Sequence, residues 1–274
     1  MPDSKPLRLL VQVAAMLVLS QCGSPASETN SKSKAPRVLL AIFAHPDDEE
    51  SVSPVLAKYA AEGVTVYLAI ATDGRLGVSA HAGIPAGDSL AAVRTAELKC
   101  AAEKLGIQPP IQFGLHDQMK MKDGLNALSG QLDTLRQAVR NLFTTLKPDA
   151  VLTWGASGWS GHPDHRLTGA VVTEVFQSQQ WGRPNQLYYA EIPTGSLPRN
   201  PVQWATVDSS FLTVKIPVSK SDYDKAKASF LCHRSQYTLA EIDQMQQLVR
   251  AALKNTAYFR PLLGVKGEQH SLFP

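Results

Sequence analysis

The sequence predicts an α/β fold: a single domain with a mostly parallel sheet and helices on both of its faces. The first observation is the continuous apolar run 37–43, which is typical of a parallel strand buried on both faces. The second is that further apolar runs alternate with helix-like stretches as far as residue 176, and strands separated by helices pair in parallel through right-handed crossovers. The third is size, because the ~238 residues from Arg37 onward are enough for one large domain with a substantial core.

The expected elements of this Rossmann-like domain follow from apolar runs and from helical periodicity. Strands are expected at 37–43, 64–71, 111–115, 150–154, 187–190 and 211–216. Helices are expected at 50–61, 91–105, 128–146, 164–176, 222–231 and 239–253. A loop with four glycines, 72–88, joins the second strand to the second helix, and Gly106 is placed to end that helix. The domain is therefore expected to span residues 37–274.

The first 36 residues are predicted to lie outside the folded domain. Lys5 and Arg8 precede a short apolar stretch, 9–19, which is the layout of a secretory signal peptide over residues 1–21. This stretch is shorter than the roughly 20 residues that span a bilayer. The string Leu19-Ser20-Gln21-Cys22 resembles a bacterial lipobox, which makes Cys22 a candidate site of lipidation, although Gln21 stands where a small residue is usual.

Residues 22–36 are rich in Ser, Pro, Lys, Ala and Thr, and we expect them to form a flexible tether. The front end as a whole predicts an exported protein of the periplasm or cell envelope, with a lipid anchor at Cys22 as the open alternative. The formal net charge is +3 and no dense Lys/Arg cluster is visible, which argues against nucleic acid as a partner. The oligomeric state has no signature in the sequence.

Two cysteines belong to the predicted domain. Cys100 and Cys232 lie in helix-like stretches with apolar neighbours, so we interpret them as small buried hydrophobic residues. A disulfide between them in an oxidising compartment is the alternative that the sequence leaves open.

Two short strings carry most of the functional information. His45-Pro46-Asp47-Asp48 follows the first predicted strand, and His162-Pro163-Asp164-His165 follows the strand at 150–154. The carboxyl edge of an open α/β sheet is where ligands bind. A residue and its i+3 neighbour share one face at a helix start, so each string can direct two metal-binding side chains to one point. The strings predict a mononuclear metal site, with zinc favoured, that activates water for hydrolysis.

The residues alone leave the coordination of this metal open. Four side chains could bind it, namely His45, Asp48, His162 and His165. Four protein ligands would make a closed structural site, whereas a catalytic zinc keeps three protein ligands and one water. Asp47 adjoins the pair without sharing its face, which suits a general base that takes a proton from that water.

The two strings together resemble those of the PIG-L/LmbE family of zinc-dependent de-N-acetylases. The resemblance rests on 44–49 and 161–165, and further segments match in the expected order: the glycine loop 72–77, the helix segment 94–98, Asp117 and the late segment 233–236. It covers residues 37–236 and is firmest up to Arg166.

This resemblance implies a role for each candidate residue. His45, Asp48 and His165 would be the zinc ligands. Asp47 would be the general base, His162 would stabilise the oxyanion, and Asp164 would orient His162. The resemblance further implies that the substrate is bound by Arg94, Asp117 and Gly74.

The sequence therefore predicts a secreted or membrane-anchored hydrolase, dependent on Zn²⁺, that removes an acetyl group from an N-acetylated amino sugar or a related small amide. The expected partner is a small N-acetylated sugar or glycoconjugate. A metal-dependent phosphoesterase is one alternative, although that chemistry usually uses two metals and more carboxylates. A non-catalytic glycan- or metal-binding envelope lipoprotein is another, although a binding protein has no need of a base at Asp47.

Overall fold

The computed structural model describes residues 36–197, 204–265 and 267–273. Residues Pro36–Pro274 form one structural unit, distinct from Met1–Ala35. The predicted signal peptide, Cys22 and nearly all of the predicted tether lie outside the described residues. Within the described ranges, no helix combines the length and the apolar character that crossing a bilayer would require.

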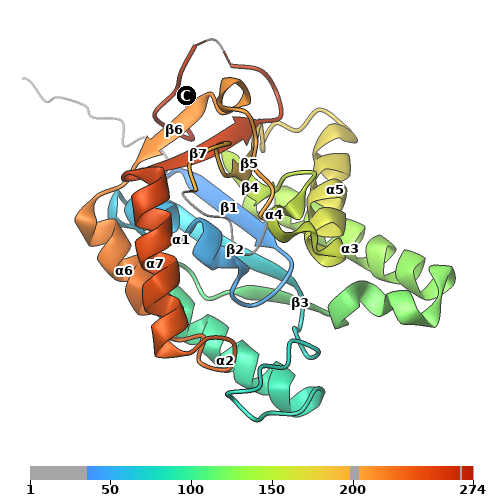
Figure 1. The fold of residues 1–274 in the computed structure, drawn as a ribbon. Helices are drawn as coiled ribbons and strands as arrows, with labels where there is room; N and C mark the ends of the chain where they lie inside the picture. Colours follow the sequence, from blue (N-terminus) through green and yellow to red (C-terminus); the bar gives the residue numbers. More distant parts are fainter. Residues whose placement is uncertain (1–35, 198–203, 266, 274) are drawn as a thin grey trace, which may run out of the picture. The chain divides into compact units, whose positions relative to one another are not determined.

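A seven-stranded sheet forms the centre of this unit (Figure 1). Its strands are β1 (Val38–Phe43), β2 (Thr65–Thr72), β3 (Ile111–Leu115), β4 (Ala150–Trp154), β5 (Gln186–Glu191), β6 (Val214–Pro217) and β7 (Thr256–Pro261). Their order in the sheet is β3-β2-β1-β4-β5-β7-β6. The first five run in parallel, and β7 is antiparallel to both β5 and β6. The predicted mostly parallel α/β fold is confirmed.

Helices cover both faces of the sheet. They are α1 (Ser53–Ala61), α2 (Asp88–Leu105), α3 (Leu125–Leu146), α4 (Gly158–Gly161), α5 (Pro163–Gln177), α6 (Lys220–Phe230) and α7 (Leu239–Leu253). Three short 3-10 turns accompany them, η1 (Asp48–Ser51), η2 (Asp117–Asp123) and η3 (Ser209–Phe211). On one face, Leu56 of α1 and Leu98 of α2 pack against the strands. On the other, Phe143 of α3 and Val172 of α5 do so.

Apart from the short helix α4 and shifts of two or three residues at the starts of α2, α3 and α6, the structure differs from the predicted elements at three places. The first helix begins at Ser53 rather than Glu50, because residues 48–51 form the separate 3-10 turn η1. The strand expected at 211–216 is β6, which begins only at Val214, because 209–211 form η3. Strand β7 was not predicted, since its six residues end in a proline and follow α7 directly through a turn of two left-handed residues, Lys254 and Asn255.

Cys100 and Cys232 form a disulfide, so their interpretation as separate buried hydrophobic residues is wrong. Both side chains are only half-buried. Helices α2 and α6 pack against each other, which brings Cys100 of α2 next to Cys232, two residues beyond the end of α6. The sequence separation of 132 explains why sequence alone does not pair them. The bond fixes the start of the segment 232–237 to α2.

Candidate metal centre and active site

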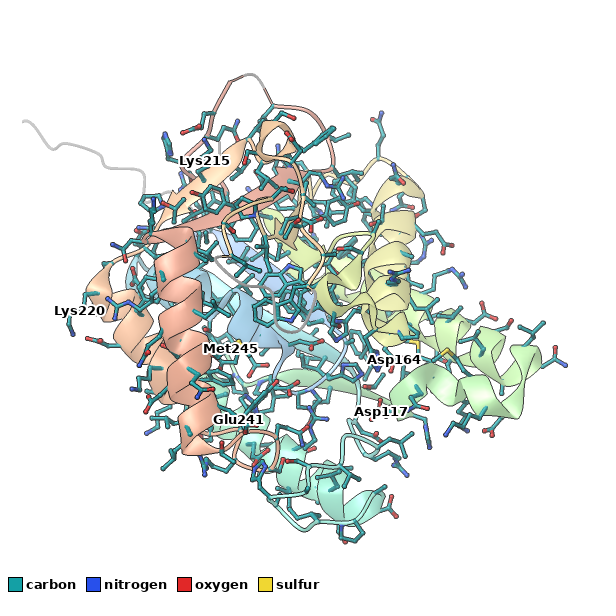
Figure 2. The ribbon with its side chains drawn as sticks, viewed as in Figure 1. Asp117, Asp164, Lys215, Lys220, Glu241 and Met245 are labelled. Atoms are coloured by element: carbon teal, nitrogen blue, oxygen red, sulfur yellow. A yellow bond between two sulfur atoms is a disulfide. The ribbon has the colours of Figure 1, made fainter. Side chains whose placement is uncertain are left out.

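The functional side chains gather at the carboxyl edge of the sheet. His45 and Asp48 follow β1, Asp117 follows β3, and the segment 158–165 follows β4. Strands β1 and β4 are neighbours whose connections leave in opposite directions along the sheet, which makes this edge the switch point where α/β folds bind ligands. Asp117, which follows β3, and Asp164, in the first turn of α5, are labelled in Figure 2, and both contact His45.

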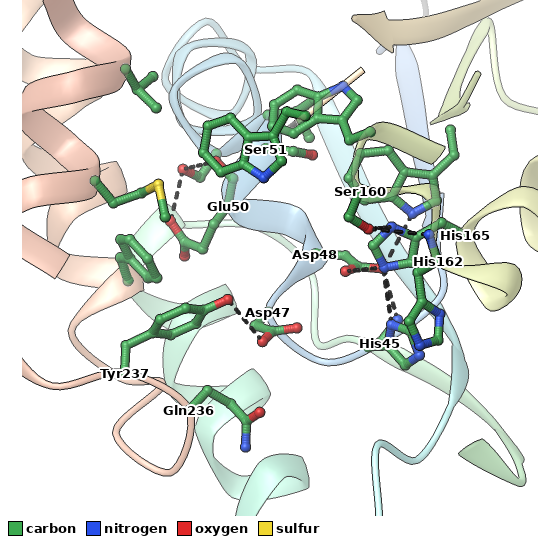
Figure 3. A pocket seen from close by; sticks show the side chains of 18 of the residues that line it. His45, Asp47, Asp48, Glu50, Ser51, Ser160, His162, His165, Gln236 and Tyr237 are labelled. Carbon is green, nitrogen blue, oxygen red and sulfur yellow. Dashed lines mark hydrogen bonds and ion pairs between the residues drawn. The ribbon is translucent and has the colours of Figure 1, made fainter. Parts of the chain in front are cut away.

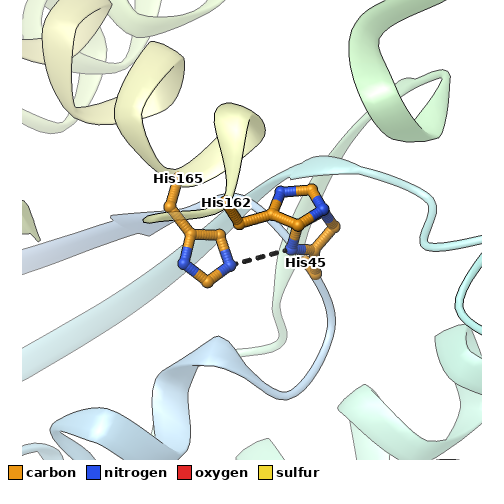
Figure 4. A group of neighbouring side chains, drawn as sticks. All are labelled: His45, His162 and His165. Atoms are coloured by element: carbon orange, nitrogen blue, oxygen red, sulfur yellow. Dashed lines mark hydrogen bonds between the residues drawn. The ribbon is translucent and has the colours of Figure 1, made fainter. Parts of the chain in front are cut away.

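Donor atoms of three residues from the two strings, His45, Asp48 and His165, form a small triangle in which Asp48 takes part with both of its carboxylate oxygens. His45 Nδ1 lies 3.2 Å from His165 Nε2 (Figure 4). Asp48 Oδ1 lies 3.1 Å from His165 Nε2, and Asp48 Oδ2 lies 3.7 Å from His45 Nδ1. Two atoms that bind one tetrahedral zinc at about 2.0–2.2 Å are themselves about 3.3–3.6 Å apart. The spacing of the three donors therefore fits a tetrahedral metal ion.

The protonation of the two imidazoles also fits a cation. His165 Nδ1 lies 2.9 Å from the Gly158 carbonyl oxygen, which can only accept, so this nitrogen carries the proton of the neutral ring. His45 Nε2 faces carboxylate oxygens of Asp164 at 3.1 Å and of Asp117 at 3.4 Å, so it carries the proton of its ring. The two neutral rings would then point lone pairs at each other, an arrangement that only a proton or a metal cation between them stabilises.

The charges around these rings reinforce that preference. Burial lowers the pKa of His45, but hydrogen bonds to Asp117, Asp164 and Asp48 raise it well above its usual value. Burial likewise lowers the pKa of His165, and the Asp48 charge raises it above normal. The site therefore favours positive charge at neutral pH.

Asp48 is held as a rigid, ionised ligand. Its Oδ2 accepts the backbone N–H groups of Ala44 and His45, both at 2.9 Å, and the Trp154 indole N–H at 3.2 Å. Burial raises the pKa of Asp48, but His165 and His45 hold it well below the usual range. The Trp154 ring also stacks on His165, 4.7 Å between centroids, so one side chain positions two of the three donors.

The carboxylate of Asp164 contacts His45 and not His162, which corrects the orientation that the resemblance implied. Asp164 is fully buried, and its Oδ2 also accepts the Gln118 backbone N–H at 2.7 Å. Only the backbone N–H of Asp164 reaches His162, donating to Nδ1 at 3.2 Å. His162 is the N-cap of α5, and its ring is engaged by this backbone N–H.

His162 stands beside the triangle. With Nδ1 accepting, the neutral ring carries its proton on Nε2 and is a donor rather than a ligand. Burial lowers the pKa of His162, and the neighbouring His45 lowers it further, so the ring stays neutral. Ring nitrogens of His45, His162 and His165 lie within 4.8 Å of one another.

Asp47 occupies an unusual backbone conformation next to the triangle. Its φ of 119° is in the left-handed region that residues other than glycine rarely adopt, and such strain is found mainly at functional sites. Asp47 Oδ1 lies 2.9 Å from the Arg94 guanidinium, and its Oδ2 accepts from the Tyr237 hydroxyl at 3.4 Å. Burial raises the pKa of Asp47, and Arg94 only partly opposes that rise. A carboxylate with a raised pKa suits proton transfer near neutral pH.

Arg94 is a buried clamp. It donates to the carbonyl oxygens of Gly74, at 3.1 Å, and of Pro46, in addition to its contact with Asp47. Gly74 has φ +65°, and a Cβ on it would lie 2.5 Å from Arg94 Nη1, so only glycine leaves room for the clamp. Both residues were predicted to bind substrate. The structure places them in contact with each other, and of the two only Arg94 lines the pocket.

One pocket of about 410 Å³ joins these groups. His45, Asp47, Asp48, His162 and His165 line one end of it. Figure 3 shows the imidazoles and Asp48 on one side, Asp47 with Tyr237 in the middle, and α7 on the far side.

Comparison with known proteins assigns the family. Residues 40–176 match the PIG-L family, described as GlcNAc-PI de-N-acetylase. The chain belongs to the PIG-L family. The predicted resemblance is thereby confirmed, and the curated PIG-L relatives below carry deacetylase names.

The curated relatives include proteins named 1D-myo-inositol 2-acetamido-2-deoxy-alpha-D-glucopyranoside deacetylase, with or without a number. The one from Catenulispora acidiphila is 30% identical over 74% of this chain and 81% of its own. The one from Mycobacteroides abscessus is 30% identical over 59% of this chain, which spans only 62% of that relative's length.

Solved structures share the PIG-L fold at low identity. The N,N'-diacetylchitobiose deacetylase of Pyrococcus horikoshii has a TM-score of 0.61 at 19% identity, covering 83% of this chain and 84% of that one. The 4-carboxy-2-hydroxymuconate hydratase of Pseudomonas putida KT2440 also has a TM-score of 0.61, at 17% identity, covering 86% and 100%. Because a hydratase shares the fold, the reaction has to be argued from the site.

Two features of this PIG-L site escaped the sequence analysis. Glu49, to which the sequence analysis gave no role, lies 2.6 Å from His233 Nε2, and both side chains are fully buried. Its other oxygen accepts the Asp47 backbone N–H at 3.0 Å, so the pair supports the left-handed turn. Burial lowers the pKa of His233, but the Glu49 charge raises it to about 9. Tyr237 was also missed, although it directly follows the segment 233–236 that carried the resemblance.

Proposed function

We propose that this chain is a Zn²⁺-dependent N-deacetylase that hydrolyses the acetamide of an N-acetylated amino sugar. The observation that carries the proposal is the donor triangle of His45, Asp48 and His165, with the strained carboxylate of Asp47 beside it. The names of the PIG-L relatives support the acetamide as the bond that is cleaved and an amino sugar as the substrate class.

His45 Nδ1, Asp48 Oδ1 and His165 Nε2 would hold the metal. Bound there, zinc would supply a Lewis acid for the acetamide carbonyl and a water of lowered pKa. Asp164 and Asp117 keep the proton of His45 on Nε2, and the Gly158 carbonyl keeps that of His165 on Nδ1, so both ligand nitrogens stay free.

Asp47 moves the proton in this proposal. It takes a proton from the attacking water as the water oxygen bonds to the acyl carbon, and gives it to the amine nitrogen as the C–N bond breaks. Acetate and the free amine are the products. Arg94 and Tyr237 each hold one oxygen of Asp47, which fixes the carboxylate for both transfers. His162 Nε2–H would donate to the oxyanion of the tetrahedral intermediate.

Export from the cytoplasm, to the periplasm or cell envelope, is part of the proposal. The signal-like residues 1–21 support it, and so does the disulfide of Cys100 with Cys232, because such bonds persist in oxidising compartments. Anchorage through a lipid on Cys22 remains a proposal from sequence alone.

Acetate release by the purified full chain tests the function. A panel of N-acetylated amino sugars is incubated with the protein as purified, after metal removal by a chelator, and after zinc is restored. We expect release to stop without metal and to return with zinc. Release that continues unchanged in the metal-free protein would refute the zinc mechanism.

A variant pair separates an enzyme from a binding protein. Asp47→Asn should lower kcat by about 10²–10⁴-fold while zinc content stays at the wild-type level, because Asp47 carries protons and does not hold the metal. Asp123→Asn, which alters an exposed carboxylate outside the pocket lining, is the matched control and should keep wild-type turnover. Equal turnover in both variants would favour a non-catalytic binding protein.

A further inference from the structure

A buried ion pair stands next to the active site without lining its pocket. Glu49 Oε1 lies 2.6 Å from His233 Nε2, and neither side chain is exposed. Burial lowers the pKa of His233, but the Glu49 charge raises it to about 9, so the ring is cationic at neutral pH. A buried ion pair is often no more stabilising than apolar residues of similar volume, so stability alone does not explain it. Neither residue lines the pocket, so neither touches a substrate there.

The second oxygen of Glu49 holds the backbone of Asp47. Glu49 Oε2 accepts the Asp47 backbone N–H at 3.0 Å, and Asp47 is the residue with the left-handed φ of 119°. Strain of this kind persists only where the surrounding structure holds it. A hydrogen bond to a charged acceptor is about twice as strong as one between neutral groups. Glu49 is therefore well suited to keep Asp47 in its strained turn.

The side chain of Asp47 is held by other residues. Arg94 lies 2.9 Å from Oδ1, and the Tyr237 hydroxyl donates to Oδ2 at 3.4 Å (Figure 3). These two contacts fix the carboxylate oxygens, whereas the Glu49 contact fixes the backbone from which the carboxylate extends. The position of the carboxylate thus depends on all three.

The imidazole of His233 serves Glu49. Its Nε2 faces Glu49, and its Nδ1 is buried with no hydrogen-bond partner among the residues that the structure describes. The hydrogen bonding of this ring is therefore directed to Glu49 rather than to a network of its own.

The chain is attached to α2 on both sides of His233. Cys232, directly before it, is bonded to Cys100 of α2. Ser235, two residues after it, donates its backbone N–H and its hydroxyl to the two carboxylate oxygens of Glu97 of α2, both at 2.6 Å. These attachments fix the position of the imidazole relative to α2.

We propose that Glu49 and His233 are positioning residues for proton transfer by Asp47. His233 orients Glu49, and Glu49 holds the turn that presents the Asp47 carboxylate to the attacking water and the leaving amine. Helix α2 then fixes the carboxylate directly through Arg94 and its backbone through His233 and Glu49. This inference rests on the proposed deacetylase function. A shift of about 1 Å can cost about 10²-fold in rate, so loss of the pair should lower kcat while zinc stays bound.

Two amide variants of His233 test the contact on the full chain. The amide nitrogen of glutamine reaches the place of Nε2, whereas that of the shorter asparagine does not. We expect His233→Asn to lower kcat about 10–100-fold and His233→Gln to recover most of that loss, with KM and zinc content at the wild-type level in both. Equal kcat in the two variants would overturn the proposal.

A double-mutant cycle tests whether the pair acts through Asp47. Glu49→Ala should lower kcat about 10–100-fold in the wild type, but less than about twofold in the Asp47→Asn background, where proton transfer is already lost. If the same loss persists in that background, Glu49 supports the fold or the metal instead, and the positioning role is wrong. The His233 pair decides the question should Glu49→Ala fail to fold.

A crystal structure of the His233→Asn variant gives a readout apart from turnover. We expect the φ of Asp47 to leave the left-handed region once Glu49 loses its partner. An unchanged φ together with unchanged kcat would overturn the proposal.

Tyr59→Phe is the control for the loss of a buried hydrogen bond. Tyr59 is 3% exposed and outside the pocket lining, and its hydroxyl accepts the Leu272 backbone N–H at 2.9 Å. This variant should keep wild-type kcat, and a loss equal to that of His233→Asn would assign the effect to general destabilisation and overturn the proposal. Acetate release by the wild type, with kcat unchanged in every Glu49 and His233 variant, would overturn the positioning role and leave the deacetylase standing. No acetate release by the wild type would refute the deacetylase and the positioning role with it.

Discussion

Replacing Asp164 with asparagine should weaken zinc binding. The Asp164 carboxylate is fully buried and lies 3.1 Å from His45 Nε2, where it keeps the ring proton away from the ligand nitrogen Nδ1. Loss of a carboxylate that supports a metal-bound histidine costs about 10–100-fold in metal affinity, or about 1.4–2.8 kcal/mol at 1.4 kcal/mol per tenfold.

Asp117→Asn should have a smaller effect on zinc affinity. Its Oδ1 is farther from the same nitrogen, at 3.4 Å, and its Oδ2 is engaged by the Leu76 backbone N–H. We expect a loss near the lower end of the range, about tenfold.

The assay is competition for zinc between each variant and a chelator of known affinity, with Asp123→Asn as the exposed control. The expected order of zinc affinity is wild type and control, then Asp117→Asn, then Asp164→Asn. If Asp164→Asn keeps wild-type zinc affinity and loses only kcat, the carboxylate acts on His162 instead, and the contact described here does not govern the site.

Three further predictions concern the rest of the chain. Burial raises the pKa of Glu191 from 4.5 to about 7, although Arg260 opposes the rise. The folded state therefore holds a proton that the unfolded state releases, so the contribution of Glu191 to the free energy of unfolding is complete below pH 4.5 and falls by about 3 kcal/mol as the pH rises through 7. Glu191→Gln should remove this pH dependence from urea-unfolding data. Serine at both Cys100 and Cys232 should lower the free energy of unfolding by up to about 5 kcal/mol, because their disulfide closes a loop of 132 residues; equal urea midpoints for variant and wild type would contradict this. Tyr237→Phe, which removes one hydrogen bond to the proton carrier, should lower kcat about tenfold with zinc content unchanged, as measured by acetate release and metal analysis.

Local patterns were sufficient to predict the parallel part of the fold. The apolar runs 37–43, 64–71, 111–115 and 150–154, each of which precedes a helix, became parallel strands, because burial on both faces leaves a continuous apolar signature. The antiparallel edge was harder: β7 has partly exposed residues, carries Arg260 and ends at Pro261, so nothing in its composition distinguishes it from a loop.

In the site, too, local sequence patterns predicted contacts between near neighbours but not contacts between distant segments. The spacing within each string placed His45 with Asp48 and His162 with His165, because three residues at a helix start return to one face. The choice of His165 over His162 as a ligand came from the family resemblance. The partners of Asp164 and Glu49 depend on contacts across the fold: Asp164 meets His45, 119 residues away, and Glu49 meets His233, 184 residues away. Arg94 has the sequence context of an ordinary helix charge, and only the packing of α2 against the loop at Gly74 buries it.

The most direct test of the central claim is a crystal structure of the zinc-loaded protein. The account predicts one zinc within about 2.0–2.2 Å of His45 Nδ1, Asp48 Oδ1 and His165 Nε2, with a water in the fourth position. A zinc held instead by Glu49, Glu50 and His233, which also lie close together, or a zinc sealed by His162 as a fourth protein ligand, would contradict it.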